Sequence, residues 1–124
     1  MWLFTEYGFF SAVVDADDKK TMVVRSRDIR HLRTLKSRFV ELDEVEIATS
    51  YDSDYAFRIR VPKRVWSKLI EQLSEDIHYS NFKSHVLRLQ GRNDYERALH
   101  EVWQVMAETQ PTVPYSQPYQ KEAK

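Results

Sequence analysis

Two tandem stretches decide the fold of this chain. They are FFSAVVDADDKKTMVVRSRDIRHLRTLKSRF (Phe9–Phe39) and VEIATSYDSDYAFRIRVPKRVWSKLIEQLSEDI (Val45–Ile77). In each, two runs that alternate in side-chain character flank a turn-forming segment, and the second run leads into apolar residues at helical spacing. The sequence therefore predicts a strand, strand, helix unit that occurs twice.

The first unit predicts strands over 9–14 and 22–27, joined by the charged loop 15–21, and then a helix capped by Asp28. The second predicts strands over 44–50 and 56–61 and a helix with Pro62 in its first turn. The side chains expected to face the core are those of Phe10, Ala12, Ile29, Leu32, Leu35, Phe39, Phe57, Ile59, Val61, Val65, Trp66, Leu69, Ile70, Leu73 and Ile77.

The flanking segments extend this plan. Trp2–Thr5 predicts a further strand, with a bulge or sharp bend at Tyr7-Gly8. Two more helices are expected, one capped by Ser80 and stopped by Gly91 and one capped by Asn93 or Asp94. Their inward side chains are expected to be Phe82, Val86, Leu89, Tyr95, Leu99, Val102, Trp103 and Met106.

The predicted class is α+β, with helices on one face of an antiparallel sheet, two C-terminal helices and a relation to ferredoxin-like folds. We expect a single domain over 1–109 and a flexible, proline-containing tail over 110–124.

Amino-acid composition excludes several classes of function. The chain has 19 basic and 19 acidic residues and so no net charge, which argues against a general polyanion binder but allows a local basic patch. It has no cysteine, which excludes disulfides and thiolate chemistry, and its two glycines cannot form a dinucleotide-binding or P-loop motif. With no signal-peptide pattern and no apolar run that could span a membrane, we expect a cytoplasmic protein.

The main candidate binding residues lie on the outward face of the predicted sheet. Period-two alternation places Arg25, Arg27, Arg58 and Arg60 on that face together with Phe9, and Tyr7 precedes them in the chain. Guanidinium groups beside an aromatic ring are suited to holding phosphates and stacking a base.

A structural role for the same arginines is the alternative. A three-residue turn in the second hairpin would place Glu46 opposite Arg58 and Glu44 opposite Arg60, as cross-strand ion pairs. The expected neighbours of Arg25 and Arg27 are Ser11 and Phe9, which offer no carboxylate. Both interpretations stay open at this point.

A second candidate is the basic face of the first helix, formed by Arg30, His31, Arg33, Lys36 and Arg38. Such a face could meet a phosphate backbone or an acidic partner, although charged helix faces are most often simply solvated. The four histidines lack metal-binding spacing, and no nucleophile motif is present, so we expect no metal, no cofactor and no catalytic residue.

Five short segments of the sequence bear on its relation to other proteins. They are WLFTEYGFFS (Trp2–Ser11), VRSR (Val24–Arg27), DYAFR (Asp54–Arg58), HYSNFK (His78–Lys83) and VWQVM (Val102–Met106). On these strings the chain resembles a group of small, uncharacterised bacterial proteins. The resemblance implies a self-standing bacterial or mobile-element protein and carries no activity, cofactor or site residue.

Two binding functions and one catalytic function follow as hypotheses. The first is a non-catalytic binding or regulatory module that contacts a protein partner or a second copy of itself, because its aromatic residues exceed what so small a core requires. The second is single-stranded nucleic-acid or nucleotide binding through the arginines. A small enzyme of undefined class is the third.

Overall fold

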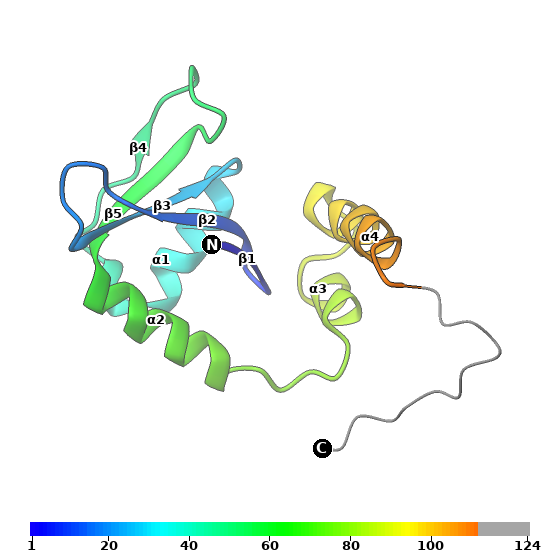
Figure 1. Cartoon of the computed structure of the whole chain (residues 1–124). Coiled ribbons are helices and arrows are strands. Elements are labelled where there is room, and N and C mark those ends of the chain that lie inside the picture. The colour runs from blue at the N-terminus through cyan, green and yellow to red at the C-terminus, as the bar shows by residue number, and fades with distance from the viewer. Residues whose placement is uncertain (112–124) are drawn as a thin grey trace.

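The computed structural model describes residues 1–111 of the 124. Five antiparallel strands form one sheet in the order β1-β2-β3-β5-β4. They are β1 (Trp2–Thr5), β2 (Gly8–Val14), β3 (Thr21–Ser26), β4 (Ala48–Thr49) and β5 (Phe57–Pro62). The two predicted hairpins therefore meet through β3 and β5, and β1 adds an edge beside β2 (Figure 1).

Two helices cover one face of this sheet. They are α1 (Ile29–Arg38), which is followed by the short 3-10 helix η1 (Val40–Leu42), and α2 (Lys63–Glu75). Leu35 of α1 and Leu69 of α2 are fully buried against the sheet residues Val24 and Ile59. Asp28 caps α1 as predicted, because its carboxylate accepts the N–H of Arg30 at 2.9 Å. Helical and strand periodicity thus predicted the core positions Leu35, Leu69 and Ile59 correctly.

The strand β4 is much shorter than the predicted 44–50. Only Ala48 and Thr49 pair with β5. The preceding residues instead pack on the helix side, where the side chains of Val45 and Ile47 contact the main core. The ammonium group of Lys36 also donates a hydrogen bond to the carbonyl of Val45. These contacts hold the segment against α1 and keep it out of the sheet.

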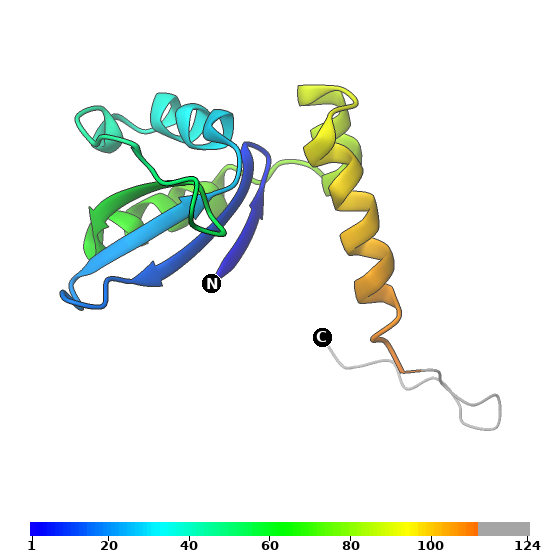
Figure 2. The same ribbon diagram turned by 90° about the horizontal axis from the view of Figure 1, so that it is seen from above.

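The last two helices form a hairpin at the β1 edge. They are α3 (Phe82–Gln90), capped by Asn81 and not by the predicted Ser80, and α4 (Asp94–Ala107), capped by Asn93. Figure 2 shows this hairpin beside β1, with α4 running past the edge of the sheet. Tyr95 anchors it, because its hydroxyl donates to the carbonyl of Thr5 at 2.7 Å. A small second core is formed there by Val86, Tyr95 and Leu99 with Phe4, Phe9 and Phe82.

Four side chains that were expected to face inward are more than half exposed: Ile77, Leu89, Trp103 and Met106. Ile77 lies beyond the end of α2 at Glu75. On α4, only the first turns meet the body of the protein, so the apolar residues of its second half have nothing to cover them within the described residues. Periodicity identifies an apolar stripe, but it cannot say how much of the stripe is in contact.

The sharp bend predicted at Tyr7-Gly8 is a two-residue turn between β1 and β2, in which Thr5 pairs with Gly8. The hydroxyl of Thr5 organises the turn by accepting the N–H groups of Tyr7 and Gly8 at 3.1 and 3.2 Å. Gly8 has φ of +150°, and a Cβ atom there would lie 2.2 Å from Cγ of His31. This glycine is therefore required both by its backbone conformation and by the close approach of α1.

The fold belongs to the α+β class, and the tandem units are β2-β3-α1 and β4-β5-α2. A relation to ferredoxin-like folds is not confirmed, because the elements do not follow the β-α-β-β-α-β order of that fold. The helix α4 ends just before the predicted boundary at residue 109, and the predicted tail, 110–124, lies outside the described residues from residue 112 onward.

Candidate functional site

The face of the sheet opposite α1 and α2 carries a row of side chains that crosses four strands. Trp2 pairs with Ser11, Ser11 with Arg25, and Arg25 with Arg58. Neighbouring positions in such a row lie on the same face of the sheet. We call the polar part of this surface the arginine face; its members are Ser11, Arg25, Arg27, Tyr55 and Arg58.

Two like charges stand directly opposite each other on the arginine face. Arg25 and Arg58 occupy paired positions on β3 and β5, an arrangement that destabilises a sheet unless a counter-charge is near. The predicted ion pairs with the second hairpin are wrong, because Ala48 and not Glu46 lies opposite Arg58. Within residues 1–111, no carboxylate oxygen lies within 4.0 Å of a guanidinium nitrogen of Arg25, Arg27 or Arg58.

Arg60 differs from the other arginines of the predicted row. It is exposed and forms an ion pair with Asp15 of the loop after β2, and not with Glu44. Sequence reasoning missed this pair because β2 and β5 are not adjacent in the sheet, and the loop reaches across β3. Arg60 therefore has a structural partner and is not part of the arginine face.

The guanidinium groups of Arg25 and Arg58 are only partly satisfied. Arg25 donates from Nη2 to Oγ of Ser11 at 2.7 Å. Arg58 donates from Nη2 to Oγ of Ser53 at 2.7 Å and to the carbonyl of Tyr55 at 3.2 Å. The Nε groups of both are buried without a partner, and Nη1 of each makes no hydrogen bond within the described residues. The site thus holds fixed cationic donors in excess of the acceptors around them.

Tyr55 fixes the position of two of these cations. Its side chain is buried, and the guanidinium carbons of Arg25 and Arg27 lie 4.5 and 4.1 Å from the centre of its ring. Arg27 also donates from Nε to the carbonyl of Asp54 at 3.3 Å. Contacts of this kind between a cation and an aromatic ring orient the arginines before any ligand arrives. Tyr55 is not among the binding residues predicted from the sequence, because nothing in the turn 51–55 shows that its ring lies under both arginines.

Aromatic side chains continue the same surface toward the β1 edge. Phe9 stacks on Phe4 with ring centres 4.6 Å apart and meets the edge of Trp2 at 5.9 Å. Phe9 therefore shares the face with the arginines, as the alternation predicted. The indole of Trp2 is 71% exposed, so one large aromatic surface at the end of the row is open to a ligand.

Tyr7 and the basic face of α1 are not brought together with the arginine face. Tyr7 packs on the helix side against the main core. On α1, Arg30 pairs with Asp28, Arg38 pairs with Asp76, and Lys36 donates to the carbonyl of Val45. Arg33 is the exposed cation left on this helix without an ion pair among residues 1–111. The helix therefore presents no continuous patch of free positive charge.

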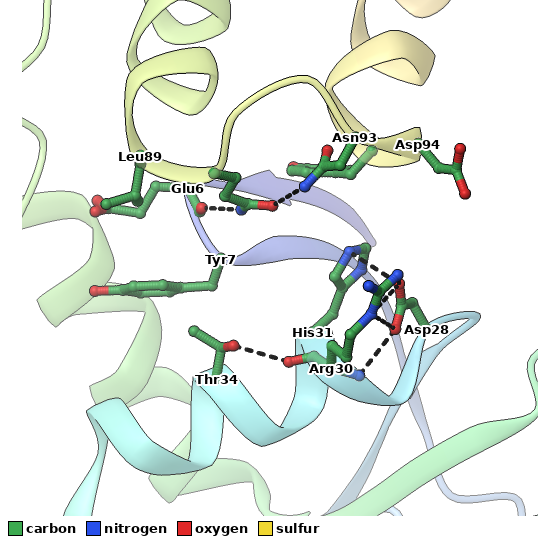
Figure 3. A pocket seen from close by; sticks show the side chains of 11 residues that line it. Glu6, Tyr7, Asp28, Arg30, His31, Thr34, Leu89, Asn93 and Asp94 are labelled. Carbon is green, nitrogen blue, oxygen red and sulfur yellow. Dashed lines mark hydrogen bonds and ion pairs between the residues drawn. The ribbon is translucent and has the colours of Figure 1, made fainter.

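A cleft of about 410 Å³ lies between α1 and the connection from α3 to α4 (Figure 3). Its polar groups are already used within the protein. Gln90 donates to the carbonyl of Glu6 at 2.6 Å, and Asn93 donates to Gln90 at 3.0 Å. The Asp28 carboxylate caps α1 and pairs with Arg30. Through these contacts the residues of the cleft attach the α3–α4 hairpin to the rest of the protein. Few donors or acceptors remain for a ligand.

His31 lies at the centre of this contact region. Its Nδ1 accepts the N–H of Phe9 at 3.3 Å, and its ring meets the ring of Tyr95 at 4.9 Å. Burial lowers the pKa of His31 below its ordinary value of 6.5. The hydrogen bond from Phe9 requires an unprotonated Nδ1, so the imidazole serves as a neutral packing and accepting group. His31 is therefore a structural residue and not part of a basic binding surface.

Comparison with protein-family models, with curated proteins and with solved structures gave no match. Among residues 1–111, no helix has the length and apolar character needed to cross a membrane. The same residues contain no group of three His, Asp or Glu side chains arranged to hold a metal ion.

Proposed function

We propose that the chain binds a phosphate-bearing ligand with a stackable base, a nucleotide or a single-stranded nucleic acid, on its arginine face, without catalysing a reaction. The observation that carries the proposal is the pair formed by Arg25 and Arg58. They are opposed on adjacent strands, have unpartnered buried Nε groups, and have no carboxylate oxygen of residues 1–111 within 4.0 Å of their guanidinium nitrogens.

Electrostatics favours an anion at this position. Two neighbouring cations without a counter-charge repel each other, and a bound anion removes that repulsion. Phosphate oxygens suit the site because guanidinium groups bind them through paired, charge-assisted hydrogen bonds. The free Nη1 groups of Arg25 and Arg58 supply the donors, and the ring of Tyr55 already holds Arg25 in place.

The aromatic end of the row favours a nucleotide over a simple anion. Trp2 lies in the same cross-strand row as Arg25 and Arg58, separated from Arg25 by Ser11. An exposed indole beside fixed cations is a combination used by proteins that bind single strands, where bases stack and phosphates pair with positive charge. Such a ligand is consistent with the cytoplasmic location expected from the sequence.

Fluorescence anisotropy with short, labelled single-stranded DNA and RNA at low salt tests this proposal. We expect binding that weakens as salt rises, because phosphate contacts release counterions. The double variant R25A/R58A should bind more weakly, and its slope of log K against log salt should be shallower by about 1.4, since each phosphate contact on a single strand contributes about 0.7.

The matched control is R33A/R64A, which removes the same charge from exposed positions on α1 and α2. It should bind as the wild type does. Failure of the wild type to bind either nucleic acid or a nucleoside triphosphate would overturn the proposal. So would equal loss in the two double variants, because it would show a response to net charge alone.

A protein partner is the second candidate, and the exposed second half of α4 favours it. Val105 and Met106 are 61% and 59% exposed there, more than isolated surface residues require. The partner is a different protein or a second copy of this chain, which would make a homodimer. Light scattering at micromolar concentration tests self-association, and a monomer at all concentrations would remove the homodimer version.

A further inference from the structure

An open groove adjoins the aromatic end of the arginine face. It lies between β1 and the α3–α4 hairpin and has a volume of about 380 Å³. Its walls include Phe4 from β1, Phe82 and Lys83 from α3, and Val102 and Trp103 from α4. Figure 2 shows the course of α4, which continues past the edge of the sheet.

The groove is connected to the arginine face by contacts between aromatic rings. Trp2 meets Phe9, Phe9 stacks on Phe4, and Phe4 forms part of the groove wall. Contacts between side chains therefore lead from Trp2 through Phe9 and Phe4 to the groove, and Trp2 lies in the same cross-strand row as Arg25 and Arg58. Because strands are about 4.8 Å apart, the part from Arg58 to Trp2 alone spans about 14 Å.

At the α4 end of this surface, Trp103 and Lys83 again place an exposed aromatic ring beside a cation, as Trp2 and the arginines do at the other end. The ammonium group of Lys83 lies 4.4 Å from the ring centre of Trp103, and the indole is 60% exposed. Lys83 has no carboxylate partner within the described residues. Glu101, two positions before Trp103, lies on the opposite side of α4, since two residues correspond to about 200° of helix.

We propose that the ligand is a single-stranded nucleic acid that crosses the strands of the sheet and continues into this groove, with Trp103 as a second stacking platform. The proposal rests on the proposed function of the arginine face and specifies its ligand. Arg25 and Arg58 hold phosphates, Trp2 stacks one base, and Trp103 stacks another while Lys83 pairs with the phosphate beside it.

The length of the surface argues against a free nucleotide as the full ligand. At the rise of about 3.4 Å per stacked nucleotide, 14 Å corresponds to roughly four nucleotides before α4 is reached. A duplex is also unsuitable, because its bases are paired and stacked inside and cannot lie on Trp2 or Trp103. A flexible single strand satisfies both the charge and the two separated indoles.

Tryptophan fluorescence of two variants, each of which keeps one exposed tryptophan, tests this path. W103F leaves Trp2 as the exposed indole and W2F leaves Trp103, while Trp66 is buried in both and gives a constant background. The probes are a thymidylate dinucleotide and an oligothymidylate of about 12 nucleotides, a length within the range of single-strand sites. We expect the dinucleotide to quench Trp2 alone and the longer probe to quench both Trp2 and Trp103.

Affinity measurements with W103A complete the test. This variant should bind the longer probe roughly tenfold more weakly or worse, as expected for loss of a stacked base, and bind the dinucleotide unchanged. V105A, which alters an equally exposed residue of α4, is the control and should bind both probes normally. Circular dichroism confirms that each variant keeps its fold.

Three other outcomes are informative, because each would show that one particular statement is wrong. If the longer probe binds in a way that depends on Arg25 and Arg58, but Trp103 is not quenched and W103A binds normally, the path into the groove is wrong and the proposed function stands. If a duplex or an oligoglutamate binds as tightly as the single strand, the assignment of a single-stranded ligand is wrong. If neither probe binds, the proposed function and this inference are both wrong.

Discussion

The two faces of the sheet are formed by alternate residues of the same strands, yet they differ in almost every other property. Toward α1 and α2, Phe10, Val24 and Ile59 are nearly inaccessible and belong to one apolar core. On the other face, Arg25 and Arg58 oppose each other, and neither forms an ion pair within residues 1–111. Since backbone pairing is common to both, the difference lies in the side chains: one face packs into the core, and the other places two guanidinium groups opposite each other.

The largest effect on stability is expected on the sheet face that α1 and α2 cover. Leu35 is fully buried between α1 and the sheet. Leu35→Ala should lower the free energy of unfolding by about 2–5 kcal/mol, through lost apolar burial and the cavity that remains. Urea denaturation measures this change. Val13→Ala, on the exposed face, is the control and should change stability by about 0.5 kcal/mol or less; a similar loss in both variants would contradict the division between the faces.

The next largest effect on stability is expected at the turn between β1 and β2. Gly8→Ala should lower stability by about 3 kcal/mol, because φ of +150° strains a residue with a Cβ atom and because that atom would meet the His31 ring. Gly91→Ala is the matched control, since Gly91 also has positive φ but has open space around its Cα. With φ of +77° and ψ of −173°, this substitution should cost about 1–2 kcal/mol through backbone strain alone. Equal losses in thermal denaturation would show that backbone strain alone matters at Gly8.

A smaller effect tests the arginine face directly. Arg58→Met should raise the free energy of unfolding at low salt by about 0.5–1 kcal/mol, because it removes the repulsion with Arg25 and an unpartnered buried donor. Added salt screens that repulsion, so the advantage of the variant should shrink as salt rises. Urea denaturation of both proteins at low and high salt measures the difference. A loss of stability at low salt would mean that the bonds of Arg58 to Ser53 and Tyr55 outweigh the repulsion.

The smallest effect is expected from pH. Burial places the pKa of His31 below 6.5, so the unfolded chain takes up this proton more readily than the folded protein does. The stability that neutral His31 contributes is complete above about pH 6.5. It is lost as pH falls from there through the lowered pKa. Asp28 and Arg30 are the charged groups nearest to the ring, and the pKa of Asp28 is itself lowered, so its own titration lies at more acidic pH.

His31→Gln should flatten this acid-side decline in thermal stability, because glutamine can accept the Phe9 N–H without titrating. His78→Gln, at an exposed position, is the control and should keep the decline of the wild type. An unchanged pH profile in His31→Gln would show that other groups cause the decline.

Local sequence patterns were enough to predict most of the elements and the side chains on each face of the sheet. Period-two alternation placed Phe9, Arg25 and Arg58 on the side opposite Phe57 and Ile59, and helical spacing identified Leu32, Leu35, Trp66 and Leu69 as core. Asp28 was recognisable as a cap and Gly91 as a stop, and the cap of α4 was narrowed to Asn93 or Asp94, of which Asn93 is correct. These features depend on neighbours a few residues apart, and short-range sterics and hydrogen bonds are enough to specify them.

Which distant groups meet depends on the tertiary structure. The short β4 strand leaves Arg58 opposite Ala48, the loop after β2 brings Asp15 to Arg60, and Tyr55 lies under two arginines. The groove beside Trp103 exists because Tyr95 fastens α4 to Thr5, a residue 90 positions earlier in the chain. Such contacts depend on strand register and on the docking of whole elements, which follow from packing of the complete core and leave no periodic signal in the residues themselves.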